Sequence, residues 1–376
     1  MRKILYTTAH ALAETDEGFD LGRSTALDLP FEAILDDALV AELRATDAGY
    51  GQVSGHARLR AAIAGRVGVA ADEVLVTHGA IGALHLAVFC LCAEGDEVLT
   101  VTPGFPATFD IIQSLGAVMR SVALEFDQGF TLDVERLAPL LSDRTRLVLL
   151  ASPHNPSGVA MSAEAIASVR ALMGERAPRS RLLIDETFRE ASYAGRAPAA
   201  SAAQVAGDVL TVASLSKAYG VPGLRIGWIT CREPELRAHL AIGKGKTAIS
   251  CSVLDERAAL AVLANADSIL GARRAALAAG LAAVDAWVAR NAERIEWVRP
   301  DAGGLCCLRL RARVYDDAAV DRFYAAAAAR GVNLAAGDVF LGARRVFRLG
   351  FGALPVERLR AALEVLEDVA RKVVAG

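Results

Sequence analysis

Short apolar runs alternate with longer helical patterns through the first two thirds of this chain. The runs that predict strands are 73–77, 97–102, 118–122, 146–151, 181–185, 209–213 and 225–230. Helical patterns accompany them, among them 57–66 and the apolar stretch 83–93. Strands that alternate with helices are typical of a largely parallel sheet covered on both faces. The pattern therefore predicts an α/β fold with a mostly parallel, seven-stranded sheet flanked by helices.

The two ends of the chain have a different pattern. A long Ala- and Leu-rich helix is predicted over 266–291, followed by a strand at 304–311, a helix at 317–330, a strand at 346–351 and a helix at 355–373. Residues 1–32 indicate a loosely structured arm with a short strand near its end, and a helix follows near 33–46. We expect an N-terminal arm (1–35) that belongs to a small α+β domain (271–376), and a large domain (36–270). No Gly/Ser- or Pro-rich linker separates them, so rigid packing is expected.

Composition narrows the class of protein. The 376 residues exceed the usual size of one hydrophobic core, which favours two domains. The net charge is −3 and no basic block stands out, so nucleic-acid binding is not expected. No apolar run approaches the roughly 20 residues of a membrane span, and the first six residues lack the apolar core of a secretion signal. We expect a cytoplasmic protein. The six cysteines form no C-x-x-C pair, which favours buried free thiols over a metal site.

The segment 214–228, SLSKAYGVPGLRIGW, carries the strongest chemical signal. It surrounds Lys217 with hydroxyl groups and glycines and places Arg225 eight residues further on. Desolvation or a nearby cation lowers the pKa of a lysine, so that its neutral amine can attack a carbonyl. Ser214 and Arg225 could hold a phosphate, since the arginine acts as a charged fork. This pattern predicts an amine that forms a Schiff base beside a phosphate.

Two further turns could complete a cofactor site. The segment 77–84, THGAIGAL, is a strand-to-helix turn of small residues, and the free N–H groups at the start of such a helix can cradle an anion. Many such turns bind nothing. The segment 103–105, PGF, places Phe105 just beyond a strand, where its ring could stack on a flat cofactor or simply join the core.

Three polar side chains at strand ends point to a heterocyclic cofactor and an amino acid. Asn155 lies between two prolines in ASPHNPSG (151–158) and could donate to a ring oxygen, although it could also be a turn former. Asp185 ends the apolar run of LLIDETF (182–188), where a carboxylate needs a partner such as a protonated ring nitrogen. Arg348 lies within the apolar strand VFRLGFG (346–352) and suits bidentate carboxylate binding or a structural ion pair. Pyridoxal phosphate and an amino acid need this set of groups.

From about Tyr50 to the C-terminus the chain resembles the class I/II aminotransferases of fold type I, the group typified by aspartate aminotransferase. The Asn-Pro and Ser-x-Ser-Lys motifs, in this order, carry the resemblance. It implies that Lys217 is the Schiff-base lysine and proton shuttle, that Asp185 pairs with the pyridine nitrogen, and that Arg348 binds the substrate carboxylate together with Asn155. The implied cofactor-binding residues are Gly79, Ala80, Ile81, Phe105, Asn155, Asp185, Phe188, Ser214, Ser216, Lys217 and Arg225, with Tyr50 reaching the phosphate of a neighbouring subunit. A homodimer is therefore implied.

The chain departs from the family pattern at two places. Phe188 stands where relatives usually carry a tyrosine that bonds the ring oxygen, which leaves Asn155 as the main donor and should raise the pKa of the lysine–cofactor imine. The arm segment DLGRS (20–24) matches the family's glycine-containing loop poorly, and Arg23 is either a solvated residue or a contact for an acidic substrate. His78 and His154 are either acid–base groups or neutral neighbours of the site.

The resemblance implies transamination from an L-amino acid to a 2-oxo acid through an aldimine at Lys217, an activity of the EC 2.6.1 type. The alternative is a pyridoxal-phosphate lyase, decarboxylase or cyclase on the same scaffold, and Phe188 keeps this open. A ligand-sensing regulator is disfavoured because no helix-turn-helix domain or basic recognition helix is evident. The substrate side chain is not specified, although the arm, the segment 244–247 and the second subunit are expected to read it.

Overall fold

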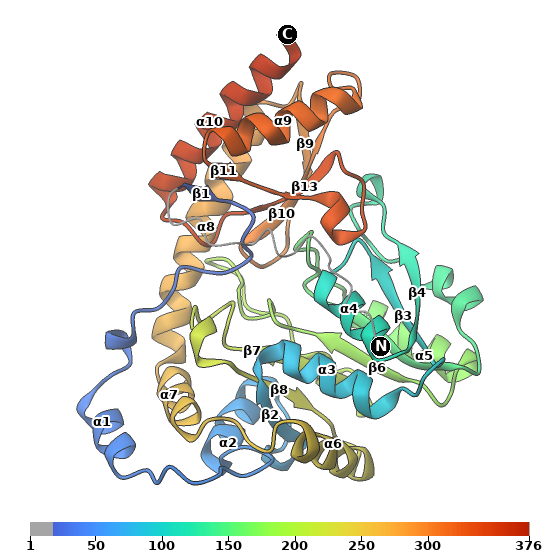
Figure 1. Cartoon of the computed structure of the whole chain (residues 1–376), viewed down its shortest axis with the longest axis vertical. Helices are drawn as coiled ribbons and strands as arrows, with labels where there is room; N and C mark the ends of the chain where they lie inside the picture. Colours follow the sequence, from blue (N-terminus) through green and yellow to red (C-terminus); the bar gives the residue numbers. More distant parts are fainter. Residues whose placement is uncertain (1–17, 376) are drawn as a thin grey trace.

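The structure, a computed structural model, describes residues 18–375. Its largest element is a seven-stranded sheet with the order β2-β8-β7-β6-β5-β3-β4 (Figure 1). The strands are β2 (Val74–His78), β3 (Glu97–Thr102), β4 (Val118–Ala123), β5 (Thr145–Ala151), β6 (Arg181–Asp185), β7 (Leu210–Ser214) and β8 (Ile226–Thr230). Only β8 runs against its neighbours, β2 and β7. The predicted α/β fold with a mostly parallel seven-stranded sheet is confirmed.

Helices cover both faces of this sheet, because its strands are apolar on both sides. Alternate residues of the strands pack against different helices: Leu183 lies in the core formed with α3 and α6, and Leu182 in the core formed with α5. The covering helices are α2 (Ala57–Val67), α3 (Gly79–Leu91), α4 (Pro106–Ser114), α5 (Ala163–Arg176), α6 (Pro234–Thr247) and α7 (Val253–Ala264). Residues 244–247 therefore end a helix, and Lys244 is buried with its Nζ donating to the carbonyl of Val53.

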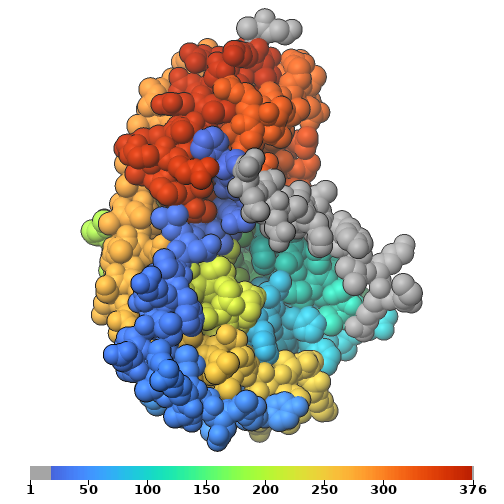
Figure 2. Space-filling view, turned by 60° about the vertical axis from the view of Figure 1, so that its left-hand side comes forward, coloured from blue at the N-terminus to red at the C-terminus, as the bar shows by residue number. Residues whose placement is uncertain are grey.

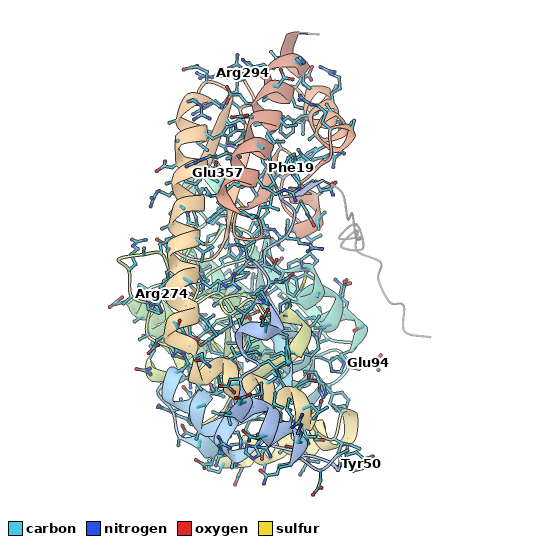
Figure 3. The ribbon with its side chains drawn as sticks, turned by 90° about the vertical axis from the view of Figure 1, so that its left-hand side faces the viewer. Phe19, Tyr50, Glu94, Arg274, Arg294 and Glu357 are labelled. Atoms are coloured by element: carbon cyan, nitrogen blue, oxygen red, sulfur yellow. The ribbon has the colours of Figure 1, made fainter. Side chains whose placement is uncertain are left out.

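A smaller antiparallel sheet lies at the other end of the molecule. Its order is β12-β13-β10-β9, with β9 (Ile295–Val298), β10 (Leu305–Leu310), β12 (Ala335–Ala336) and β13 (Val346–Gly350). The helices α9 (Asp317–Ala329) and α10 (Val356–Ala375) pack beside it. The long helix α8 (Ala266–Arg290) runs along the molecule from the large sheet to the small one (Figure 3). The predicted helix over 266–291 corresponds to α8.

The N-terminal arm is joined to the small sheet by a backbone hydrogen bond. Its short strand β1 (Phe19–Asp20) pairs with β11 (Val332–Asn333), and the N–H of Gly350 donates to the carbonyl of Leu21. A side chain at position 350 would collide with the carbonyl of Arg23, because a Cβ there would lie 1.7 Å from that oxygen. From β1 the chain passes down one side of the molecule to α1 (Asp37–Arg44) and α2 (Figure 2). Residues 1–17 of the predicted arm lie outside the described residues.

The helix predicted near 33–46 is shorter because Asp36 caps it. The Asp36 carboxylate accepts from the N–H of Leu39, so α1 begins at Asp37, and the residues before it form a separate 3₁₀ turn. The 3₁₀ turns are η2 (Phe31–Ala33), η3 (Ala71–Glu73), η4 (Phe126–Gln128), η5 (Val134–Leu140), η6 (Ala202–Gln204), η7 (Pro222–Leu224) and η8 (Gly337–Phe340). Within residues 18–375, no helix combines the length and apolarity that a membrane crossing requires.

Candidate active site

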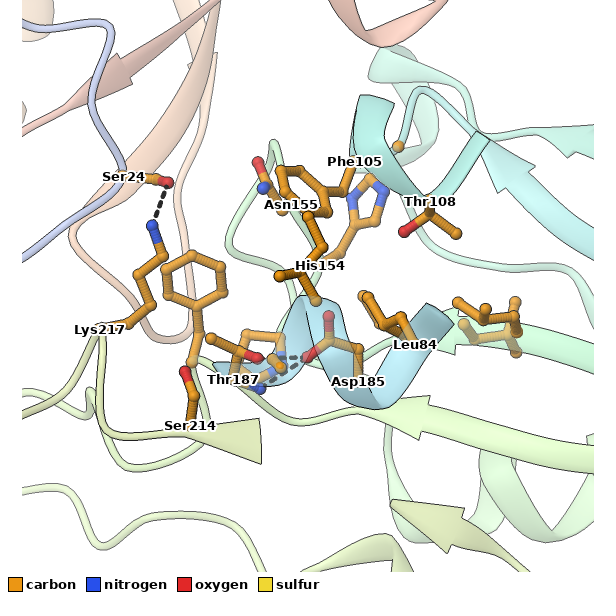
Figure 4. A pocket seen from close by; sticks show the side chains of 18 of the residues that line it. Ser24, Leu84, Phe105, Thr108, His154, Asn155, Asp185, Thr187, Ser214 and Lys217 are labelled. Carbon is orange, nitrogen blue, oxygen red and sulfur yellow. Dashed lines mark hydrogen bonds between the residues drawn. The ribbon is translucent and has the colours of Figure 1, made fainter. Parts of the chain in front are cut away.

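The predicted site residues meet at one edge of the large sheet. Asp185 ends β6, while Lys217, Asn155 and Phe105 follow β7, β5 and β3. Because these strands are parallel, their carboxyl ends lie at the same edge, where open α/β sheets bind ligands. All four side chains line one cavity of about 250 Å³ (Figure 4). Residues from four separate turns thus line the same cavity.

Lys217 lies in this cavity with its amine in a largely dry environment. Its Nζ donates to the Ser24 hydroxyl at 3.1 Å and lies 5.9 Å from the centre of the Phe188 ring. Burial lowers the pKa of Lys217 to about 8, and the positive charges of Arg348 and Arg225 act in the same direction against Asp185. About one tenth of this amine is therefore neutral at pH 7, far more than for an ordinary lysine, and the neutral form is the nucleophile.

Asp185 presents a carboxylate whose hydrogen bonds come from Thr187. Its Oδ1 accepts from the backbone N–H of Thr187 at 2.9 Å and from the Thr187 hydroxyl at 2.5 Å. Burial raises the pKa of Asp185, and it forms no salt bridge with any described residue. A protonated ring nitrogen beside it would supply a positive charge.

Asn155 and Arg348 form a buried pair. Nη1 of Arg348 donates to Oδ1 of Asn155 at 2.9 Å, which leaves the amide NH₂ of Asn155 to donate elsewhere. Nη2 of Arg348 donates to the carbonyl of Gly22, and the guanidinium lies 4.7 Å from the centre of the Phe340 ring.

The guanidinium of Arg348 has unused capacity for an anion. Its Nε is buried without a hydrogen-bond partner, and burial lowers the pKa of Arg348 to about 10. The structural ion pair considered for this arginine is not found among residues 18–375. Arg348 is therefore a buried cation able to receive a carboxylate.

The start of α3 forms a cradle beside Arg225. Gly79 has a φ of +67°, and a Cβ at this position would lie 2.8 Å from Nη2 of Arg225. Gly227 is equally restricted, because a Cβ there would lie 2.4 Å from the carbonyl carbon of Gly79. The first N–H groups of the helix have no side-chain cap. Free N–H groups, a helix N-terminus and an arginine fit a phosphate, and the cavity between them is lined by Ala80, Ile81, Ser214, Ser216 and Arg225.

Two aromatic rings line the same cavity. Phe105 precedes α4 and is about one third exposed, so its face is available to a flat ligand. Phe188 is buried and has no hydroxyl to offer. Phe188 therefore lines the cavity without supplying a hydrogen-bond donor, as the sequence predicts.

Of the other residues singled out from the sequence, Tyr50 does not line this cavity, whereas His154 does. Tyr50 lies far from it at the end of the molecule, with 86% of its surface exposed (Figure 3). Both ring nitrogens of His154 have partners, the Ser157 hydroxyl and the Pro103 carbonyl, and burial lowers the pKa of His154 to about 4. His154 is therefore a neutral, structural neighbour. Arg23 forms a salt bridge with Asp20 at 3.0 Å rather than standing free in solvent.

Two hydroxyl-bearing residues of the site were not anticipated as site residues. The Ser24 hydroxyl accepts a hydrogen bond from Lys217, and the Thr187 hydroxyl donates one to Asp185 (Figure 4). Thr187 is two residues beyond the strand-ending carboxylate, a spacing at which a hydroxyl and an N–H can both reach it. Nothing in the sequence pattern places Ser24 beside Lys217, because the contact joins residues 193 positions apart.

Comparisons with known proteins place this arrangement in a family. The sequence matches the family model "Aminotransferase class I and II" over residues 16–366. It is 32% identical to capreomycidine synthase of Streptomyces vinaceus, over 84% of this chain and 79% of that protein. It is 28% identical to the arginine–pyruvate transaminase AruH of Pseudomonas aeruginosa, over 94% of this chain and 90% of that protein.

One solved structure extends the comparison to three dimensions. The PLP-dependent cyclase OrfR has a TM-score of 0.84 and 27% sequence identity, and the match covers 96% of this chain and 95% of that one. The family model spans most of the chain, including the lysine, carboxylate, asparagine and arginine that line or adjoin the cavity. The chain belongs to the class I and II aminotransferases.

Proposed function

We propose that this chain uses Lys217 and pyridoxal phosphate to move an amino group from an L-amino acid to a 2-oxo acid. Pyridoxal phosphate is the cofactor of this aminotransferase, and when bound it supplies an aldehyde that attaches to amines and a ring that withdraws electrons from the substrate Cα. The observation that carries the proposal is the meeting of Lys217, Asp185 and Asn155 in one cavity, with Arg348 bonded to Asn155.

The position of each side chain supports the role proposed for it. Lys217 would hold the cofactor covalently and, once displaced, move the proton at the substrate Cα. Asp185 would hold a proton on the ring nitrogen, and Arg348 would orient the substrate carboxylate. The other residues proposed to hold the cofactor are Gly79, Ala80, Ile81, Phe105, Asn155, Phe188, Ser214, Ser216 and Arg225.

A cyclase or another lyase-type activity is the second candidate. The similarity to capreomycidine synthase and to the cyclase OrfR favours it, and so does Phe188, which removes a hydroxyl from the cofactor's surroundings. The two candidates differ in what happens to the donor. A transaminase releases a 2-oxo acid and keeps the amino group on the enzyme, whereas a cyclase keeps the amino group in its product.

The test is a single-turnover reaction of the cofactor-loaded enzyme with a broad panel of amino acids. Transamination predicts release of a 2-oxo acid together with a lasting change in cofactor absorbance, reversed by adding a 2-oxo acid. Lys217→Ala should abolish both. A cyclic or unsaturated product, with the absorbance returning unaided, would favour the second candidate. Turnover of Lys217→Ala at the wild-type rate would contradict both.

The proposed assembly is a homodimer with sites near the interface. Large apolar side chains are exposed on α3, α6, α7 and nearby loops, namely Tyr50, Ile81, Phe89, Ile242, Ile249 and Leu254. Lys244 and Glu256 hold the Tyr50 loop through the backbone of Val53 and His56, so this exposed ring is presented by an ordered loop.

Mixing two inactive variants tests this assembly. If Tyr50 serves the second subunit's phosphate, Tyr50→Ala and Lys217→Ala subunits mixed at limiting cofactor should regain activity, because each mixed dimer has one intact site. No recovery of activity from subunits shown to have exchanged would contradict the proposed assembly.

The division into 1–35, 36–270 and 271–376 is likewise proposed, supported by the two separate sheets. A cytoplasmic location stays a prediction.

A further inference from the structure

A second cavity of about 430 Å³ adjoins the first one and lies against the N-terminal arm. Lys217, Ser24 and Phe105 line both cavities, and Arg348 lines the second. A substrate with its amine near Lys217 and its carboxylate on Arg348 would therefore have this space available for its side chain. The lining of the second cavity should reflect the chemistry of that side chain.

The arm supplies the charged groups of this cavity. Asp20, Arg23 and Asp28 all line it. Nε of Arg23 pairs with Oδ2 of Asp20 at 3.0 Å, and the Arg23 side chain is about half exposed. Asp28 forms no salt bridge with any residue in 18–375, although its charge acts on Arg273, which does not line this cavity. Once Lys217 is assigned to the cofactor and Arg348 to the carboxylate, these three groups leave the cavity with one net negative charge.

This charge balance disfavours a substrate with an acidic side chain. Among the described residues that line this cavity, Arg23 is the cation left for such a group, and it already pairs with Asp20. Drawing Arg23 away would place a second carboxylate beside the ligand. A cationic side chain meets the opposite situation, since Asp28 is exposed and forms no salt bridge within residues 18–375, and Asp20 already receives a guanidinium. Leu334, Val339 and Phe340 add an apolar wall that suits an aliphatic stem.

A second observation fixes the other end of the ligand. Arg348 is 5% exposed, and its Nε has no partner. The two adjoining cavities thus combine a buried receptor for a carboxylate with an acidic opening.

We propose that the amino-acid substrate carries a guanidinium at the end of an aliphatic side chain, and that Asp20 and Asp28 read this group. The inference rests on the proposed function only in that Arg348 binds the α-carboxylate. A transaminase named for arginine, 28% identical over 94% of this chain, agrees with it.

Binding of an unreactive ligand to the cofactor-loaded enzyme tests the proposal without turnover. 5-Guanidinopentanoate has the carboxylate and the guanidinium but no amine, and 5-ureidopentanoate is its neutral counterpart. We expect calorimetry to show the guanidino compound binding about tenfold more tightly, the range for charge-assisted contacts. The double variant D20N/D28N should remove most of that difference, because asparagine keeps an oxygen but not the charge. E32Q, which changes an exposed arm acid outside the cavity, should leave it intact.

Arg23→Gln provides a variant with the opposite expected effect. It frees Asp20 from its internal partner, so the guanidino compound should bind more tightly, whereas loss of a folded arm would weaken both ligands. The proposal is overturned if the two compounds bind equally, if D20N/D28N leaves the preference unchanged, if the dianion heptanedioate binds most tightly, or if none of the ligands binds. Retained discrimination in an enzyme that transaminates no donor would instead refute the proposed function and leave this inference standing.

Discussion

Nη1 of Arg348 donates a hydrogen bond of 2.9 Å to Oδ1 of Asn155, although the two residues lie 193 positions apart. This contact joins the small sheet to the turn after β5. It also sets the direction of the Asn155 amide, whose NH₂ must then face away from the arginine. One guanidinium thus orients the proposed donor to the cofactor and remains able to bind a carboxylate.

Arg348→Lys tests whether Arg348 orients Asn155 and binds the substrate carboxylate. Lysine keeps the charge but loses the fork that bonds Asn155 and a carboxylate together. We expect KM to rise by roughly tenfold or more for every amino-acid donor, the usual loss for a charged hydrogen bond. Steady-state kinetics on several donors checks this. Arg345→Lys, at a half-buried arginine of the same segment paired with Asp317, is the control and should change little. Equal KM values for R348K and the unmodified enzyme would contradict the assigned role.

The rate of cofactor uptake should depend on pH through Lys217. Only the neutral amine reacts, so with a pKa of about 8 the reactive fraction rises about fivefold from pH 7 to pH 8. Rapid mixing of the cofactor-free chain with pyridoxal phosphate, followed by absorbance, measures this rate.

Two charge variants should shift the pH profile of cofactor uptake in opposite directions. Arg348→Gln removes a charge that lowers the pKa of Lys217, so the profile should move to higher pH. Asp185→Asn removes a charge that raises this pKa, so the profile should move to lower pH. Profiles that coincide for all three proteins would refute this electrostatic account.

Phe188→Tyr restores a hydroxyl to the cavity. Such a hydroxyl can donate to an anionic ring oxygen and so favours the deprotonated form of the bound cofactor. We expect the pH midpoint of the cofactor's absorbance change to fall, which a spectroscopic titration records. Phe89→Tyr, on an exposed face of α3, is a matched control that should keep the original midpoint. An unchanged midpoint in F188Y would show that position 188 does not contact the ring oxygen.

Gly79→Ala tests the phosphate cradle. The residue has a φ of +67°, where an alanine costs about 1–2 kcal/mol, and the added Cβ would displace Arg225. We expect the dissociation constant for pyridoxal phosphate to rise about tenfold or more, as measured by fluorescence titration. Gly65→Ala lies on the exposed face of α2 with nothing within 4 Å, so it should stabilise the helix by roughly 0.5–1 kcal/mol and leave cofactor binding unchanged. Equal affinities in both variants would argue against the cradle.

The large sheet could be predicted because its strands are continuous apolar runs. The segments around Asp185 and Lys217 were found as strand ends followed by polar residues, and the parallel direction of the strands then brought these residues together. The antiparallel direction of β8 could not be read in this way, since a buried strand shows the same apolar run in either direction.

Contacts between distant segments set the limit of the sequence-based predictions. The bond from Lys217 to Ser24 and the pairing of Arg23 with Asp20 depend on where the arm crosses the sheet edge, which hydrogen bonds from Gly350 and Leu29 determine. The segment 244–247 is expected from the sequence to help read the substrate side chain, but it ends the helix α6, and Lys244 is buried against the Tyr50 loop. Local composition contains no information about such tertiary contacts.

The most direct test locates the cofactor on the chain. Borohydride reduction of the cofactor-loaded enzyme fixes the cofactor to its lysine, and peptide mass spectrometry identifies that residue among Lys3, Lys217, Lys244, Lys246 and Lys372. We expect one label per chain, on Lys217. A label on any other lysine, or none on a chain that has bound the cofactor, would contradict it.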